Sequence, residues 1–233
     1  MKKFILIIIL MVITFGVATS SFAVTLWYNG DTNQVNGVAN EINSIVSQAN
    51  VYDDFIVSPE GWIIDTLWSN NLMGFTTNQA YWEIRSGVSS GNGGTVIASG
   101  TNSAARTSTG RSSFGWNEYT IMVSGLNISL PAGTYWLTVA PIGSGSGRSF
   151  NSTTAGFNSL GIPGGYNLNA FFNSSYFGKN FIPSTSIYYN CTDFSMGIGG
   201  ALGGNYPVPE PASLCLLGLG LVGLIGFRKK VAS

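Results

Sequence analysis

The chain has 233 residues, a formal net charge of zero and no histidine. Only 9% of its residues are charged while 13% are aromatic, a balance that is typical of secreted β-rich proteins and excludes an intrinsically disordered chain, which has few aromatic residues. The absence of histidine excludes Ser-His-Asp and Cys-His catalytic machinery and histidine metal sites.

The charges are distributed unevenly along the chain. Between residues 24 and 208 there are nine acidic and five basic residues, a net charge of −4. An acidic body argues against a nucleic-acid partner, because binding to phosphates requires a basic face. Cys191 is the one cysteine of the body and Cys215 lies near the C-terminus, so no intramolecular disulfide is expected once the C-terminal segment is removed. A buried thiol or an intermolecular bridge remains for Cys191.

The N-terminal segment has the features of a secretory signal peptide. Lys2 and Lys3 precede an apolar stretch over residues 4–17, and small residues follow up to Ala23. A charged start, a short apolar core and a small-residue exit predict a signal peptide over residues 1–23, with cleavage between Ala23 and Val24. The alternative is an uncleaved membrane helix. The Sec translocon and signal peptidase are the partners that this segment requires.

The body, residues 24–204, is predicted to consist of many short strands separated by Gly, Asn and Ser turns. Residues 61–68 are apolar on both faces and suit a central strand, and residues 79–86 alternate in hydrophobicity, with Ala80, Trp82 and Ile84 on one face. Glycines at 91–94 predict a turn before the next strand. Further alternating segments cover residues 118–126 and 134–141. Only residues 37–49 also permit a helix.

The spacing of these strands predicts an all-β body. Intervals of about 8 to 15 residues between strands are typical of a two-sheet β-sandwich, here expected to be jelly-roll-like. No internal repeat is present in the sequence.

Carboxylates are the remaining candidates for catalysis. Glycoside hydrolysis needs two of them about 5 to 10 Å apart across a cleft. Glu83 and Arg85 share a strand face and can pair with neighbouring residues or with solvent, so we expect them to have a structural role. We expect no catalytic residue in the body and no enzymatic activity. A polysaccharide-active hydrolase is the alternative, with six candidate acids in the body (Asp53, Asp54, Glu60, Asp65, Glu83 and Glu118).

Calcium is the one cofactor for which the sequence offers ligands. Asp53 and Asp54 are adjacent, and extracellular sandwich proteins bind Ca²⁺ with carboxylate and backbone oxygens. Adjacent residues of a strand point to opposite faces, so one of the two could bind Ca²⁺ together with loop carbonyls, and both could do so only within a turn.

Aromatic and amide side chains are concentrated in residues 165–190, which contain eight Phe or Tyr residues and one charge. Flat aromatic faces beside amide groups suit a polysaccharide ligand. We expect Phe171, Phe181 and Tyr188 to be core residues. The exposed glycan-binding candidates are three tyrosines (Tyr166, Tyr176 and Tyr189).

The C-terminal segment, residues 205–233, has three parts. A proline-rich stretch ends in Pro209-Glu210-Pro211 (209–211), sixteen uncharged residues follow at 212–227, and Arg228, Lys229 and Lys230 (228–230) come next. As a helix the apolar part would span roughly 24 Å, slightly less than a hydrocarbon core of about 30 Å, and the basic end should stay cytoplasmic. A permanent anchor, a buried helix and a removable signal are the alternatives; a buried helix would need a polar face, which this part lacks.

This tripartite tail resembles the sorting signal of PEP-CTERM proteins, with the motif Pro209-Glu210-Pro211, a Gly- and Leu-rich apolar segment and a short basic end. The resemblance covers about 25 residues. It implies recognition by an exosortase-type peptidase, transient passage through the inner membrane, and delivery to the cell surface or extracellular matrix of a bacterium that makes exopolysaccharide.

The body also resembles sandwich domains that accompany such tails, over segments near residues 51–65, 80–100 and 129–141. That resemblance implies a fold and a setting, and no reaction. The sequence therefore predicts an exported, non-enzymatic structural or adhesive module associated with exopolysaccharide.

Overall fold

The computed structural model describes residues 24–145, 147–164, 167–187 and 193–204. Across these residues the chain forms β-strands and a single short 3₁₀ turn, η1 (Ser184–Ser186), and no α-helix. The strands are β1 (Val24–Tyr28), β2 (Thr32–Ala39), β3 (Asn50–Val57), β4 (Trp62–Met73), β5 (Gln79–Ser86), β6 (Thr95–Ser113), β7 (Trp116–Val123), β8 (Ile128–Leu130), β9 (Gly133–Ile142), β10 (Ser149–Thr154), β11 (Phe171–Ser174), β12 (Lys179–Pro183), β13 (Asp193–Phe194) and β14 (Met196–Leu202).

The helical alternative for residues 37–49 is wrong. Residues 37–39 end β2, and the remainder forms a loop that closes where the backbones of Glu41 and Ala49 exchange hydrogen bonds of 2.8 and 2.9 Å. Asn43 accepts hydrogen bonds from the backbone N–H groups of Ile45 and Val46, both at 2.8 Å. Because a local side-chain acceptor competes with the backbone acceptors of a helix, Asn43 favours the turn.

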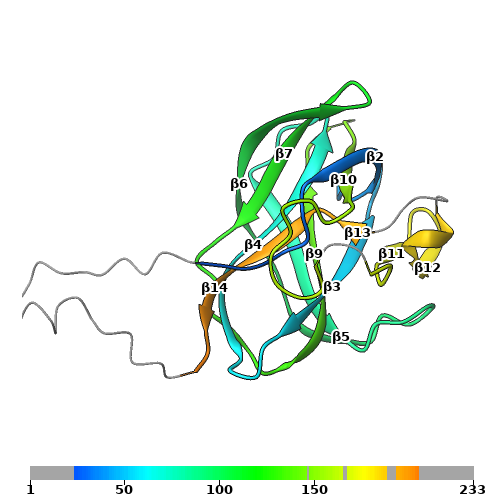
Figure 1. Cartoon of the computed structure of the whole chain (residues 1–233). Helices are drawn as coiled ribbons and strands as arrows, with labels where there is room; N and C mark the ends of the chain where they lie inside the picture. Colours follow the sequence, from blue (N-terminus) through cyan, green and yellow to red (C-terminus); the bar gives the residue numbers. More distant parts are fainter. Residues whose placement is uncertain (1–23, 146, 165–166, 188–192, 205–233) are drawn as a thin grey trace, which may run out of the picture. The chain divides into compact units, whose positions relative to one another are not determined.

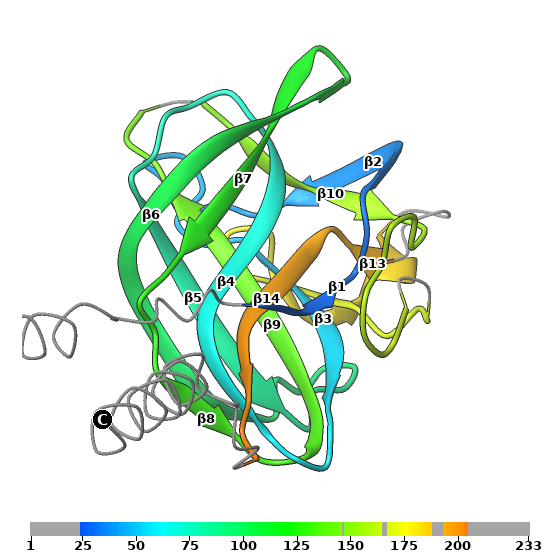
Figure 2. The ribbon, with the colours of Figure 1, turned by 60° about the vertical axis from the view of Figure 1, so that its left-hand side comes forward.

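The strands form one antiparallel sheet that folds over at its longest strand. Its main path runs β1-β14-β4-β7-β6-β5-β9-β3-β11-β12, and β6 pairs with β5 through residues 95–103 and with β7 through residues 104–113. Figures 1 and 2 show β6 curving along one side of the body, between β5 and β7. Because β6 belongs to both halves of the sheet, the halves can face each other and neither has an unpaired strand edge where they join.

The core lies between these two halves, so the all-β body is sandwich-like. Fully buried side chains from both halves make up one hydrophobic cluster: Leu67, Ile121 and Ile198 from β4, β7 and β14, and Phe55, Ile84 and Leu137 from β3, β5 and β9. In a sandwich, side chains from the two inner faces interdigitate in this manner, and their burial stabilises the packing of one half on the other.

The predicted strands at 61–68, 79–86 and 134–141 are confirmed, and the one at 118–126 is confirmed as far as Val123, where β7 ends. β5 has the predicted bounds, and its residues Ala80, Trp82 and Ile84 are buried in the core, whereas Glu83 and Arg85 pair on the other face. The glycine turn before β6 is confirmed as well, because Gly91 and Gly94 have φ angles of +75° and +61°.

The ends of the body meet. β1 pairs with β14 so that Val24 lies opposite Gly200, and the body through Gly204 forms one compact unit that contains all the described strands. The predicted signal peptide (1–23) and the tail (205–233) lie outside the described residues. In the part of the chain that is described, no helix has the length and hydropathy that crossing a membrane requires.

Candidate binding groove

Two neighbouring hollows on the body share Gly37 and Phe150, and together we call them the aromatic groove. The larger hollow has a volume of about 390 Å³ and the smaller about 200 Å³. The larger is lined by Gly37, Val38, Ala39, Arg148, Phe150, Phe172, Phe177, Lys179, Ile182, Ser186 and Ile187, and the smaller by Asn36, Gly37, Leu72, Phe114, Trp116 and Phe150. A concave site with mostly apolar walls and a few polar groups is typical of a ligand-binding site.

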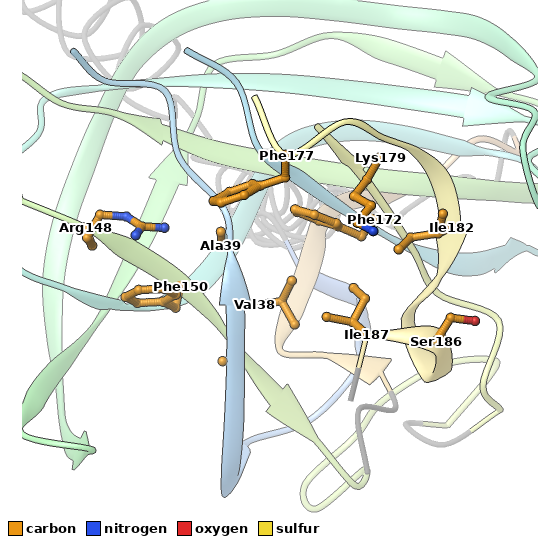
Figure 3. A pocket seen from close by; sticks show the side chains of 11 residues that line it. Val38, Ala39, Arg148, Phe150, Phe172, Phe177, Lys179, Ile182, Ser186 and Ile187 are labelled. Carbon is orange, nitrogen blue, oxygen red and sulfur yellow. The ribbon is translucent and has the colours of Figure 1, made fainter. Parts of the chain in front are cut away.

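The larger hollow is walled by rings from separate parts of the chain. Phe177, in the turn between β11 and β12, is 40% exposed, and its ring centroid is 6.1 Å from that of the buried Phe172. The Cζ atom of Arg148 lies 4.9 Å from the centroid of Phe150 and 5.9 Å from that of Phe177. Figure 3 shows this guanidinium directed at the space between the two rings. It therefore joins two aromatic walls by cation–π contacts.

Arg148 is held in place by a buried carboxylate. Its Nε donates to Oε1 of Glu41 at 2.6 Å, and Glu41, which is fully buried, also accepts from the backbone N–H of Ser149 at 2.9 Å and from the amide of Asn43 at 2.8 Å. These three hydrogen bonds fix the carboxylate of Glu41, which in turn holds Arg148. Glu41 itself does not line the groove. Among the described residues, the two terminal nitrogens of the guanidinium have no hydrogen-bond partner.

Lys179 supplies the second charge of the larger hollow. It is exposed, and none of the ion pairs among the described residues includes it. Figure 3 shows Arg148 on one side of Phe177 and Lys179 on the other. No carboxylate lines either hollow, so the charges that line the groove are both positive.

The smaller hollow is formed by the hairpin that joins β6 to β7. Ser113 pairs with Trp116, and the two residues between them, Phe114 and Gly115, have φ angles of +54° and +77°. Positive φ at both central residues is what a two-residue type I′ turn requires. The turn leaves the ring of Phe114 63% exposed.

Trp116 and Gly37 form the rest of this hollow. The indole of Trp116 covers Gly74, where a Cβ would come within 2.0 Å of the ring, and it meets Phe150 edge-on at 6.0 Å between centroids. A Cβ at Gly37 would lie 3.0 Å from that of Phe150. Glycine at position 37 therefore lets Phe150 pack close to β2 where the two hollows meet.

The predicted glycan-binding tyrosines have different outcomes. Tyr176 is 51% exposed and packs edge-on against Phe177, with 4.8 Å between the ring centroids, so it lies beside the groove. Tyr166 and Tyr189 lie outside the described residues, as does Tyr188. Phe171 and Phe181 are buried, as predicted for core residues.

Asp53 and Asp54, the predicted calcium ligands, are both buried in β3 and are occupied by separate donors. Asp53 accepts hydrogen bonds from Asn29 at 2.7 Å and from the backbone N–H of Phe194 at 2.5 Å, whereas Asp54 accepts from the amides of Asn167 and Asn169. Burial raises the pKa of both carboxyls, and the nearby charge of Asp193 raises that of Asp53 further.

No group of three or more Cys, Asp and Glu residues in the described ranges is arranged to hold a metal ion. Calcium bound by one of these aspartates together with loop carbonyls stays a prediction.

Glu83 and Glu118, two of the candidate carboxylates for a hydrolase, lie in hydrogen-bond networks that have a structural role. Burial alone would raise the pKa of Glu83, but hydrogen bonds from Arg85, Tyr81 and Tyr52 outweigh it and lower the pKa. Glu118, which is fully buried, accepts from Arg111 and Ser152, both at 2.5 Å. Glu60 is exposed and Asp65 is half-buried.

Sequence reasoning missed most of the groove. Residues 165–190 were selected for their aromatic density, and they supply Phe172, Phe177 and Lys179. Arg148, Phe114 and Trp116 were not selected, because they come together only through the pairing of β2 with β10 and the fold at β6. One signal was available: Phe114 precedes a glycine in a turn where Asn is the preferred residue.

The fold and this groove define an all-β protein with an open, aromatic surface site. The comparison with protein families adds the C-terminus: residues 207–230 match the model of the PEP-CTERM protein-sorting motif. The chain therefore carries the sorting domain that Pro209-Glu210-Pro211 and the basic end indicated. This motif implies an exosortase-type processing partner and export to the cell surface or extracellular space. No curated protein and no solved structure shows a significant match to the chain.

Proposed function

We propose that this chain is an exported surface or matrix protein that binds polysaccharide and does not cleave it. The observation that carries the proposal is the aromatic groove, which is lined by the rings of Phe114, Trp116, Phe150 and Phe177 and by no carboxylate. The C–H faces of sugar rings bury apolar surface against aromatic rings, and about 25 cal/mol is gained for each Å² removed from water. Retention of a polysaccharide needs no more chemistry than this.

The route of the protein follows from its two ends. The signal peptide (1–23) directs the chain through the Sec translocon and is cut between Ala23 and Val24. The apolar segment 212–227 stops in the inner membrane as a helix, and an exosortase-type peptidase processes the tail at 209–211. The jelly-roll-like body is then delivered to the exopolysaccharide around the cell, where its role is structural or adhesive.

A glycan array with the body, residues 24–204, tests the proposal, because this part is a compact unit of its own. We expect binding to at least one class of bacterial polysaccharide and a loss of about tenfold on Phe177→Ala. Phe157→Ala is the matched control, because Phe157 is 72% exposed and lines neither hollow. If no glycan binds, or if binding is the same in both variants, the groove is not a glycan site.

A hydrolase remains the alternative, and no feature of the groove favours it. Incubation of the body with the bound polysaccharide should release no reducing ends. Release that is lost on Glu118→Gln or Glu83→Gln would replace the binding function by a catalytic one.

A further inference from the structure

The two hollows of the aromatic groove are neighbours that share Gly37 and Phe150. Trp116 touches Phe150 edge-on, and Arg148 stacks on Phe150 and reaches Phe177. At the other shared residue, Gly37, the absence of a side chain lets Phe150 lie close to the backbone. Neighbouring ring-lined compartments suit a ligand built of repeated rings, and a linear chain of sugars has that form.

The charge of the groove differs from that of the rest of the body. Nine acidic and five basic residues give residues 24–208 a net charge of −4, yet the charged side chains that line the groove are Arg148 and Lys179. The nearest counter-charge, Glu41, is fully buried. A neutral glycan would not require two cations, whereas each of these cations can donate hydrogen bonds to a carboxylate.

Phe114 supplies the exposed ring of the smaller hollow. A bulky residue with positive φ is a backbone outlier, and Phe114 has a φ of +54°. Asn or Gly would relieve the strain, but only an aromatic residue places a ring, 63% exposed, at the end of the smaller hollow.

We propose that the aromatic groove binds a linear polysaccharide whose sugars carry carboxylates, an inference that rests on the proposed binding function and names its ligand class. Acidic sugars lie along Phe177, with carboxylates next to Arg148 on one side and next to Lys179 on the other. The following sugars run over Phe150 towards Trp116 and Phe114.

The test is isothermal titration of the body, residues 24–204, with oligogalacturonates of one to eight sugars and with their methyl esters. The esters keep the rings and remove the charge. We expect the free acids to bind at least tenfold more tightly than the esters at 50 mM salt, with a smaller difference at 500 mM. Affinity should rise with length until the chain spans both hollows and then stay constant.

Two variants locate the two contributions. Lys179→Met keeps the aliphatic stem of an exposed residue that pairs with no described group, and should weaken the free acids about fivefold or more while leaving the esters unchanged. Phe114→Asn keeps the turn and removes the ring, and should weaken the longer oligomers and not the shortest. Arg148 is left intact, because its removal would leave Glu41 buried without its ion partner.

The failures of the two proposals are distinguishable. Esters that bind as tightly as acids, or a Lys179→Met variant that binds acids normally, would overturn the acidic ligand and leave a neutral-glycan groove. Affinity that is independent of length would overturn a site that spans both hollows. If neither acids nor esters bind, and the glycan array is also negative, both proposals are lost.

Discussion

Asp193 is one of several buried carboxyl groups whose shifted pKa values make the stability of this fold depend on pH. It is 1% exposed; one of its carboxylate oxygens accepts from the backbone N–H of Asn167 at 2.7 Å, and the other has no partner among the described residues. Burial raises its pKa to about 6, and the neighbouring Asp54 adds to this. The donors around Asp53 and Asp54 are side-chain amides and backbone N–H groups, so neutral groups surround three buried carboxylates.

The first prediction concerns Asp193→Asn, which keeps the acceptor and removes the charge. A carboxyl whose folded-state pKa is raised stabilises the fold below its unfolded pKa of about 4, and this contribution is lost as pH rises through about 6. We expect the variant to be more stable than the wild type by about 2 kcal/mol at pH 8, and equally stable at pH 4. Urea denaturation at both pH values measures this.

Asp31→Asn is the contrasting variant. Burial alone would raise the pKa of Asp31, but hydrogen bonds from Tyr28 and Asn158 and the charge of Arg111 outweigh it and lower the pKa. Its contribution is present at neutral pH and lost in acid, so this variant should be less stable than the wild type at pH 8. If Asp193→Asn is also less stable than the wild type at pH 8, the prediction is wrong, and the ionised carboxylate of Asp193 is stabilised by a positively charged or hydrogen-bonding group.

At the scale of elements, the β6–β7 hairpin combines a structural cost with an exposed ring. A non-glycine residue in the left-handed region costs roughly 1–2 kcal/mol, and Asn tolerates it best. We therefore expect Phe114→Asn to raise the free energy of unfolding by about 1 kcal/mol while binding is impaired. Denaturation of the purified body measures the first effect, and a less stable variant would indicate that the ring of Phe114 packs on the fold.

The strands were more predictable than the groove. β5 was predicted to the residue because an antiparallel strand that is buried on one face alternates with period two. Residues 40–49 were open to a helical reading because the apolar spacing there cannot show that Asn43 caps a turn. The groove depends on Gly37, Phe114, Arg148 and Phe177, which are far apart in sequence, so local patterns carry no information about their proximity.

At the scale of the whole molecule, the expected signal peptide and the sorting motif together predict two new chain ends. Mass spectrometry of the exported protein should find Val24 as the first residue and the tail shortened near 209–211. In cells without the sorting peptidase the tail should be retained. Replacing Pro209 and Pro211 by Ala should reduce processing, because proline disfavours helix at the residue before it and a peptidase requires an extended substrate. A mature protein with an intact tail in normal cells would indicate a permanent anchor.

The pairing of β1 with β14 also orders events in time. The strand that pairs with β1 along its length is the last one, β14, which contributes Met196 and Ile198 to the core. Because synthesis adds about 5–20 residues per second, we expect most of the body to be made before its core can be completed. β14 ends at Leu202, immediately before the sorting tail. We therefore expect the body to finish folding only when the residues next to the sorting motif have been made.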